Sequence, residues 1–228
     1  MTDHAEPVAA DPLRRAADTM KAVRDTCVWS QQIDHRALVP YLVEESAELI
    51  DAVEVGTRAD LREELGDLLW QVLFHAEIAS RDTDDPFDID DVARTLTDKM
   101  VRRHPHVFGE ETARTPEDVL VLWNAAKAAE KRSRTSVLDG VSERMPTLAL
   151  AQKLLGKADS VGLRTPTDAE TVGTVPPASE EELGEALLRL VVISRARGWD
   201  AERALRGRLR SLQREIREAE TAPADLEE

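Results

Sequence analysis

The chain has 228 residues, and its 45 acidic against 30 basic side chains give a formal net charge of −15. This balance argues against non-specific binding to nucleic acid or to an anionic membrane surface, because both need a basic face. No apolar run approaches the roughly 18 residues of a membrane span, and the polar start of the chain lacks the apolar core of a secretory signal. The single cysteine, Cys27, excludes an intramolecular disulfide framework, and we expect a cytoplasmic protein.

Helical periodicity dominates the chain from beginning to end. After a loose tail over 1–12, apolar residues at three- and four-residue spacing predict helices. These cover residues 13–27, 36–55, 59–80, a stretch ending near 103, 116–131, 147–161, 180–196 and 200–220. The short turn after Val55 predicts that the second and third helices are antiparallel neighbours. Strand-like alternation is scarce, so the predicted class is all-α.

Cap residues mark several of the expected helix ends. Asp88 or Asp90 is suited to cap the helix that ends near Arg103, and Pro105 stops that helix because proline disfavours a helical residue before it. Thr115 is suited to cap the next one, with proline at its first position. Residues 162–179 contain three prolines and two glycines, which predicts a linker.

Two acidic segments repeat one pattern at the same helical phase. Residues 42–48 and 61–67 both read Leu-x-Glu-Glu-x-x-acid. At about 100° per residue, Glu45 and Glu48 lie at one edge of the first apolar stripe, and Glu64 and Asp67 lie at the same edge of the second. The stripes expected to pack together are Leu42, Ser46, Leu49, Ile50 and Val53, and Leu61, Leu65, Leu68, Leu69, Val72 and Ala76.

Packing of these two helices would bring four carboxylates together. Four adjacent anions are destabilising unless a cation joins them, and Mg²⁺ or Mn²⁺ suits oxygen ligands. Gly66, inside the second helix, costs about 1 kcal/mol relative to alanine, which suggests a packing or ligand-approach reason. Paired acids on amphipathic helices are usually solvated, however, so helical phase alone leaves both interpretations open.

A family resemblance adds to this pattern. Glu44-Glu45-x-x-Glu48, followed after fifteen residues by Glu64-x-x-Asp67, resembles the EExxE–ExxD signature of the all-α nucleoside triphosphate pyrophosphohydrolases. The surrounding text, including LVPYLVEESAELIDAV, LREELGDLLWQVLFHAEIA and DKMVRRHPHVFGEE, is similar to the MazG proteins. The resemblance is strong from about 28 to 130 and weaker beyond.

The resemblance implies an antiparallel helical bundle that hydrolyses nucleoside triphosphates to monophosphates and pyrophosphate, with the removal of unwanted or non-standard nucleotides as its task. It implies that Glu45, Glu48, Glu64 and Asp67 bind Mg²⁺, with Mn²⁺ as the alternative, and that Glu44 orients water or supports the ligands. Glu44 and Glu45 are the expected catalytic residues. A homodimer is expected by the same analogy.

Cationic and aromatic side chains complete the expected substrate site. Lys99 and Arg103, four residues apart, resemble the family's phosphate contacts; the alternative is a solvated basic patch. Trp123 and Lys127, also four apart, resemble a base-stacking and phosphate-binding pair; the alternative for the tryptophan is a core role. The histidines on either side of Pro105 are expected to be structural, because hard Mg²⁺ prefers oxygen.

The second half resembles a damaged copy of the first. Glu182-Leu183-Gly184-Glu185 is similar to residues 64–67, and 199–216 aligns without gaps on 87–104. In that alignment Ser211 stands where Lys99 is and Glu215 where Arg103 is. The expected organisation is therefore a flexible tail over 1–12, a catalytic helical domain over 13–135 and a degenerate repeat over 136–228 with its linker at 162–179.

Two other functions compete with the enzyme. One is an acidic helical interaction module, and the other is a nucleotide-binding regulator without turnover. The intact five-acid signature disfavours both, since a non-catalytic copy would resemble the second half of this chain.

Overall fold

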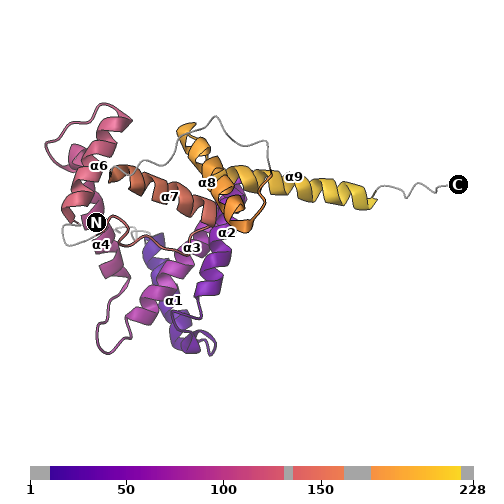
Figure 1. Ribbon diagram of the computed structural model, residues 1–228. Coiled ribbons are helices and arrows are strands. Elements are labelled where there is room, and N and C mark those ends of the chain that lie inside the picture. Colours follow the sequence, from indigo (N-terminus) through magenta and orange to yellow (C-terminus); the bar gives the residue numbers. More distant parts are fainter. Residues whose placement is uncertain (1–10, 131–135, 162–175, 222–228) are drawn as a thin grey trace, which may run out of the picture. The chain divides into compact units, whose positions relative to one another are not determined.

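The computed structural model describes residues 11–130, 136–161 and 176–221, with side chains described as far as residue 214. The chain divides into two compact units, residues 1–130 and 131–228, which are described separately. In the described ranges both units consist of helices and contain no strand (Figure 1). The all-α class expected from the sequence is therefore confirmed.

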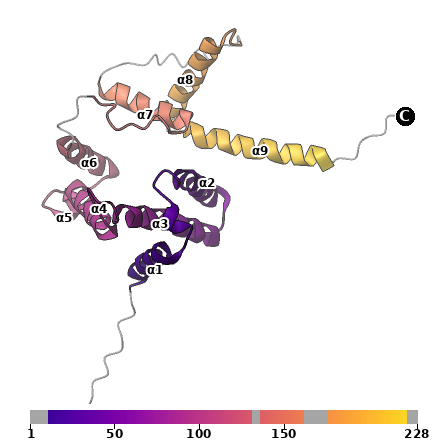
Figure 2. The same cartoon turned by 90° about the horizontal axis from the view of Figure 1, so that it is seen from below.

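The first unit contains six α-helices and one 3-10 turn among its described residues. They are α1 (Pro12–Thr26), η1 (Ser30–Gln32), α2 (Val39–Val55), α3 (Arg58–Ala79), α4 (Ile89–Arg103), α5 (Pro105–Phe108) and α6 (Pro116–Glu130). Helix α3 lies between α1 and α2 and contacts both (Figure 2). Helix α4 contacts α3, α5 and α6, so it connects the two ends of this unit.

Side-chain caps set the starts of the principal helices. Thr57 accepts hydrogen bonds from the first backbone N–H groups of α3, and Asp60 accepts one from the Thr57 backbone in return. Asp88, one of the two caps expected for α4, makes the same reciprocal arrangement with Asp91. These boxes satisfy donors that a helix N-terminus otherwise leaves unpaired.

The core of the first unit centres on the C-terminal half of α3. Leu73 and Phe74 of α3 are buried together with Met20 of α1 and Leu38, which precedes α2. The expected α2–α3 stripe is wrong in part, because Val53, Leu65 and Val72 are 65%, 53% and 46% exposed. Leu42 and Ile50 are also more than a third exposed. The prediction considered the α2–α3 pair alone, whereas α1 packs against α3 as well and takes up much of its apolar surface.

The described residues of the second unit form three mutually contacting helices, α7 (Thr147–Ser160), α8 (Glu180–Ala196) and α9 (Ala201–Thr221) (Figure 1). Leu155 and Val191 are the buried apolar residues among those that the structure describes in this unit. Arg195 of α8 crosses α7 beside Gly156, where an added Cβ would lie 2.9 Å from Nη1, and its Nη2 donates to Asp159 at 2.6 Å. Most of the expected linker, 162–175, lies outside the described residues. No helix in the described ranges combines the length and apolar character that crossing a membrane requires.

Candidate functional site

Three of the predicted metal-binding carboxylates meet between α2 and α3. Glu45 and Glu48 project from α2 and Glu64 from α3, and one carboxylate oxygen from each lies within 4.8 Å of the others. The helices become neighbours because the Gly56–Thr57 connection between them is short and the capping box starts α3 at once. Helical spacing on two antiparallel neighbours thus produces a compact group of anions.

The electrostatics of this carboxylate cluster are those of a site that lacks positive charge. Burial, followed by the charges of Asp67 and Glu48, raises the pKa of Glu45. Burial, followed by Glu48 and Asp67, likewise raises the pKa of Glu64. The Oε2 atom of Glu64 is buried and has no hydrogen-bond partner. A buried carboxylate oxygen without a donor is costly, so this atom favours a bound cation.

The donor set and its spacing fit a small divalent cation. All three groups offer oxygen, which suits Mg²⁺, Mn²⁺ and Ca²⁺ rather than softer metals. At Mg–O distances of about 2.1 Å, two ligand oxygens are at most about 4.2 Å apart. One oxygen from each of the three carboxylates lies within 4.8 Å of the others, which is close to that spacing. Small rotations of the carboxylates would bring them to the distances that a bound ion requires.

The other acids of the signature lie beside the cluster. Asp67 is not part of the three-oxygen group, but its charge acts on both Glu45 and Glu64. Glu44 is exposed, and its charge also acts on Glu45. The packing reason suggested for Gly66 is wrong, because an added Cβ there would meet nothing within 4 Å. The ligand-approach reason stays a prediction.

The cationic side of the predicted site forms around Arg103 at the end of α4. Its Nη2 donates to Oε2 of Glu130 at 2.6 Å, and its Nε donates to the same oxygen at 3.1 Å. The guanidinium lies over the ring of Trp123 at 5.1 Å, and the ring of His104 meets that indole at 5.1 Å and 69°. The structure therefore brings Arg103 and Trp123 together and adds Glu130 to them.

Lys99 and Lys127 occupy the helix faces expected of them. Lys99 is half-buried one turn before Arg103 on α4, and it makes no ion pair within the described residues. Lys127 is half-buried one turn after Trp123 on α6. His104 Nδ1 lies 2.7 Å from the carbonyl oxygen of Met100, and because a carbonyl can only accept, Nδ1 carries the proton. His104 is the residue that follows the last turn of α4, and this hydrogen bond pairs one of the carbonyls at that end. This contact supports the structural role expected for His104.

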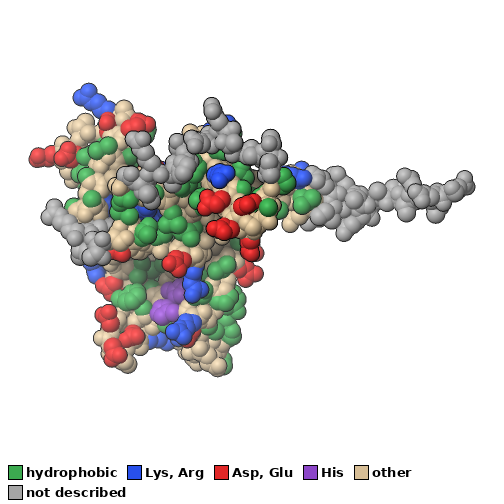
Figure 3. Space-filling model, in the orientation of Figure 1, with side chains coloured by type: hydrophobic (Ala, Val, Ile, Leu, Met, Phe, Trp, Pro, Cys, Tyr) green, Lys and Arg blue, Asp and Glu red, His purple; other side chains and the backbone are tan. Residues whose placement is uncertain are grey.

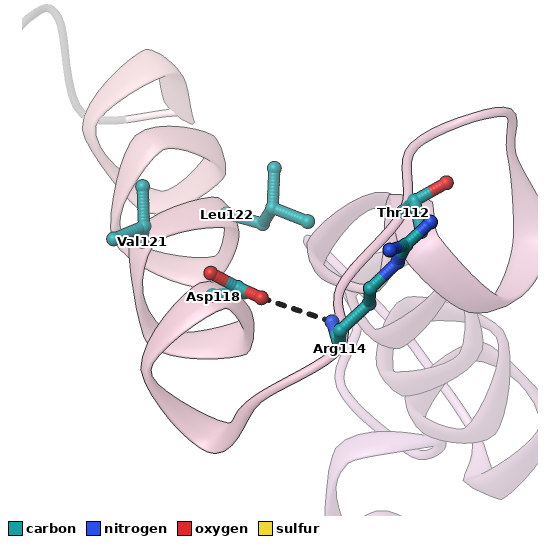
Figure 4. Close-up of a pocket in the computed structure, with 5 residues that line it drawn as sticks. All are labelled: Thr112, Arg114, Asp118, Val121 and Leu122. Carbon is teal, nitrogen blue, oxygen red and sulfur yellow. Dashed lines mark hydrogen bonds between the residues drawn. The ribbon is translucent and has the colours of Figure 1, made fainter.

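An open cavity of about 430 Å³ lies near the start of α6 (Figure 4). Thr112, Arg114, Asp118, Val121 and Leu122 line it. The Asp118 carboxylate accepts hydrogen bonds from the backbone nitrogens of Arg114 and Thr115, at 2.9 and 3.1 Å. Asp118 thus completes the capping arrangement that Thr115 begins at the start of α6. Its carboxylate is used in the fold, so we do not place the active site in this cavity.

Sequence reasoning missed two features of the first unit. Glu130 lies seven residues after Trp123 and therefore on the same face of α6, a spacing that would have indicated it. The rings of His35 and His75 meet with their Nδ1 atoms 2.8 Å apart, and burial followed by His35 lowers the pKa of His75. Forty residues separate these histidines, so no local pattern indicates the pair.

Comparisons with known proteins agree on one family. A family model described as the MazG nucleotide pyrophosphohydrolase domain matches residues 33–108. An uncharacterized 26.1 kDa protein of Streptomyces cacaoi is 47% identical over 89% of this chain and 80% of its own length. The nucleoside triphosphate pyrophosphohydrolase of Mycobacterium tuberculosis is 42% identical over 83% of this chain and 58% of its own length. The protein of the same name from Escherichia coli K12 is 32% identical over 90% of this chain and 86% of its own length.

Proposed function

Since the chain belongs to the MazG family of nucleoside triphosphate pyrophosphohydrolases, we propose that its carboxylate cluster is the centre at which a nucleoside triphosphate is hydrolysed to the monophosphate and pyrophosphate. The observation that carries this proposal is the convergence of Glu45, Glu48 and Glu64, one of which has a buried, unpartnered oxygen. All three lie within the residues that the family model matches.

We propose Mg²⁺ as the ion of this cluster, with Mn²⁺ as the alternative. Glu45, Glu48 and Glu64 would hold it, and Asp67, whose charge acts on both Glu45 and Glu64, would be the fourth ligand. A bound cation would offset the charge of the carboxylates and polarise the phosphoryl oxygens of the substrate. The exposed Glu44 would hold the attacking water and its proton, with Glu45 as the catalytic residue next to it.

The protein's own cations would bind the rest of the substrate. A triphosphate carries about four negative charges at neutral pH, so the carboxylates alone would repel it. We propose that Lys99 and Arg103 of α4 and Lys127 of α6 bind phosphate oxygens. Trp123, whose ring already contacts the Arg103 guanidinium, would stack on the base.

We further propose that the protein is a homodimer. Helix α2 carries a stripe of exposed residues at alternating four- and three-residue spacing. The stripe consists of Val39, Val43, Ser46, Ile50 and Val53. Figure 3 shows apolar side chains at the surface among acidic and basic ones. An exposed stripe of this spacing suits packing against a second helix. Sedimentation of wild type and of Val43→Glu would test it, since the variant should be monomeric.

The remaining parts of the proposal concern the second unit and the cellular role. We propose that 136–228 is a degenerate repeat without a second active site, that the protein is cytoplasmic, and that it removes non-standard nucleotides. These statements extend the family resemblance and the absence of matching acids on α7, whose only acidic residue is Asp159.

The decisive experiment is an assay of pyrophosphate release from a panel of standard and base-modified NTPs and dNTPs, with Mg²⁺, with Mn²⁺ and with chelator. Pyrophosphate and monophosphate should appear in equal amounts and only with metal. Release of orthophosphate instead would contradict the proposed bond cleavage. Nucleotide binding without any release would favour the non-catalytic alternative.

A further inference from the structure

We propose that Glu130 is a positioning residue, which fixes the Arg103 guanidinium so that one of its edges faces the triphosphate. This inference rests on the proposed function, in which Arg103 binds phosphate. Glu130 lies 27 positions further along the chain, at the C-terminal end of α6, just as Arg103 lies at the C-terminal end of α4. Neither the acidic signature nor the lysine–arginine pattern of α4 includes it.

The choice of donor atoms is the first argument. Glu130 accepts hydrogen bonds from Nε and Nη2 of Arg103, at 3.1 and 2.6 Å. These two nitrogens share one edge of the planar guanidinium. A carboxylate bound on that side leaves the end of the fork, Nη1 and the second Nη2 hydrogen, for another oxyanion. The hydrogen bonds of Arg103 to described residues use Nε and Nη2 and leave Nη1 unused. The bound acid therefore orients the arginine without occupying all its donors.

The surroundings of the pair are the second argument. Trp123 covers one face of the guanidinium at 5.1 Å, and the Arg103 side chain is 14% exposed, against 57% for its neighbour Arg102. The Glu130 side chain is 22% exposed, and its hydrogen bond with Arg103 lowers the pKa of Glu130. A carboxylate on one side and an indole on one face remove the rotational freedom of a side chain that is normally among the most mobile.

The pair also explains how an arginine beside an acid still serves an anionic substrate. Glu130 offsets one charge of α4, where Arg102 also approaches it with Nε at 3.4 Å. Because the Arg103 side chain is already ordered, binding phosphate at the open edge costs less entropy than ordering a free side chain. Removing Glu130 should therefore weaken phosphate binding, even though it removes a negative charge from the site. A carboxylate that merely competed with substrate would have the opposite effect.

The test is a double-mutant cycle on Glu130→Gln and Arg103→Lys in the full chain, with Arg102→Ala as the matched control. Calorimetric titration with tripolyphosphate and Mg²⁺ measures phosphate binding, and steady-state kinetics measures KM and kcat. Glu130→Gln should weaken tripolyphosphate binding and raise KM about tenfold, with kcat within about threefold of wild type. In the Arg103→Lys background it should have no further effect, because lysine has no fork to orient. Arg102→Ala should change binding less than about twofold.

Several results would overturn the inference. Unchanged or tighter tripolyphosphate binding in Glu130→Gln would do so, and so would an equal loss from Glu130→Gln in the Arg103→Lys background, which would indicate that Glu130 only attaches α6 to α4. Thermal melting identifies a variant that has lost its fold, and the cycle then decides from the folded variants. If wild type releases no pyrophosphate, the proposed reaction fails, while the titration still tests the role of Glu130.

Discussion

Glu64 on α3 and Glu182 on α8 begin the same short sequence, Glu-Leu-Gly-acid, but their carboxylates have different surroundings. Glu64 lies against two acids of α2 and has a buried oxygen without a partner. Glu182 accepts a hydrogen bond from the backbone nitrogen of Ala178 at 2.7 Å, next to Ser179, which caps α8. One acid is therefore part of an anionic cluster, and the other stabilises the start of its helix.

The neighbouring helix accounts for this difference. Helix α2 brings Glu45 and Glu48 to α3, whereas α7, which contacts α8, carries Lys153, Lys157 and a single acid, Asp159. That aspartate is already paired with Arg195. An i, i+3 pair of acids therefore indicates a cation site only when the neighbouring helix supplies further acids within a few ångströms of it.

The same contrast extends to the helices expected to bind phosphate. Helix α4 presents Lys99 and Arg103, where the aligned positions of α9 are Ser211 and Glu215. The Ser211 hydroxyl donates to the carbonyl of Gly207 in its own helix, at 3.3 Å. The second unit thus lacks the acids of a facing helix, and at the aligned positions of α9 it also lacks both cations.

The largest effect should follow from removing one of the acids that α2 supplies to the cluster, because the second unit has no such acids on α7. Glu48→Gln should lower metal-dependent turnover at least about 100-fold, since even groups that only support metal ligands are worth 10–100-fold. Metal-induced thermal stabilisation should disappear as well. The measurements are pyrophosphate release and melting with and without Mg²⁺. The matched control is Glu185→Gln on α8, and equal losses in both variants would refute the contrast between the units.

A second prediction exchanges the cations. The double variant Lys99→Ser, Arg103→Glu copies α9 into α4 and places a carboxylate beside Glu130, so kcat/KM should fall roughly 10- to 100-fold. Stabilisation by Mg²⁺ should remain, because the carboxylate cluster is unchanged. Kinetics and metal titration by thermal melting separate the two effects. Loss of metal stabilisation would show that the cationic and anionic groups are not separate parts of the site.

The helices could be predicted from the sequence because their ends carry explicit signals. Asp88 and Thr115 are caps whose hydrogen bonds the structure contains, and the expected bounds lie within about three residues of the observed ones. The single turn of α5 is a difference from the predicted elements, in which Pro105 only ends α4. Local chemistry thus determines where helices begin, and a one-turn helix leaves almost no periodic signal.

The site could be predicted only where its residues share a helix face or a motif. The phase of Glu45 and Glu64 is visible from spacing, and three of the four expected acids do converge. The Arg103–Glu130 pair joins two helices, and its formation depends on how α4 and α6 pack. For the same reason the exposed Val53 and Leu65 were misassigned to the core, since periodicity identifies an apolar face without identifying what covers it.

A third prediction compares how the units respond to acid. All five histidines lie in the first unit, and burial and His35 lower the pKa of His75. The unfolded chain then binds a proton at a higher pH than the folded unit does, so stability is full above about pH 6.5 and falls as pH decreases. Melting from pH 7.5 to 5.5 should lower the transition of the first unit by a few degrees. His75→Asn, which keeps a hydrogen-bonding group without titrating there, should reduce the change, and an equal response of both units would contradict it.

The smallest effects, of opposite sign, are expected from the two aligned acids themselves. Glu64→Gln should raise the metal-free melting temperature of the first unit, because it removes one of several mutually repelling carboxylates. Glu182→Ala should destabilise the second unit by about 0.5 kcal/mol through loss of the hydrogen bond to Ala178. It should leave pyrophosphate release unchanged within about twofold. If instead Glu182→Ala raised stability and lowered turnover, the acids of α8 would be acting as a second anionic site, and this unit could not be a degenerate copy.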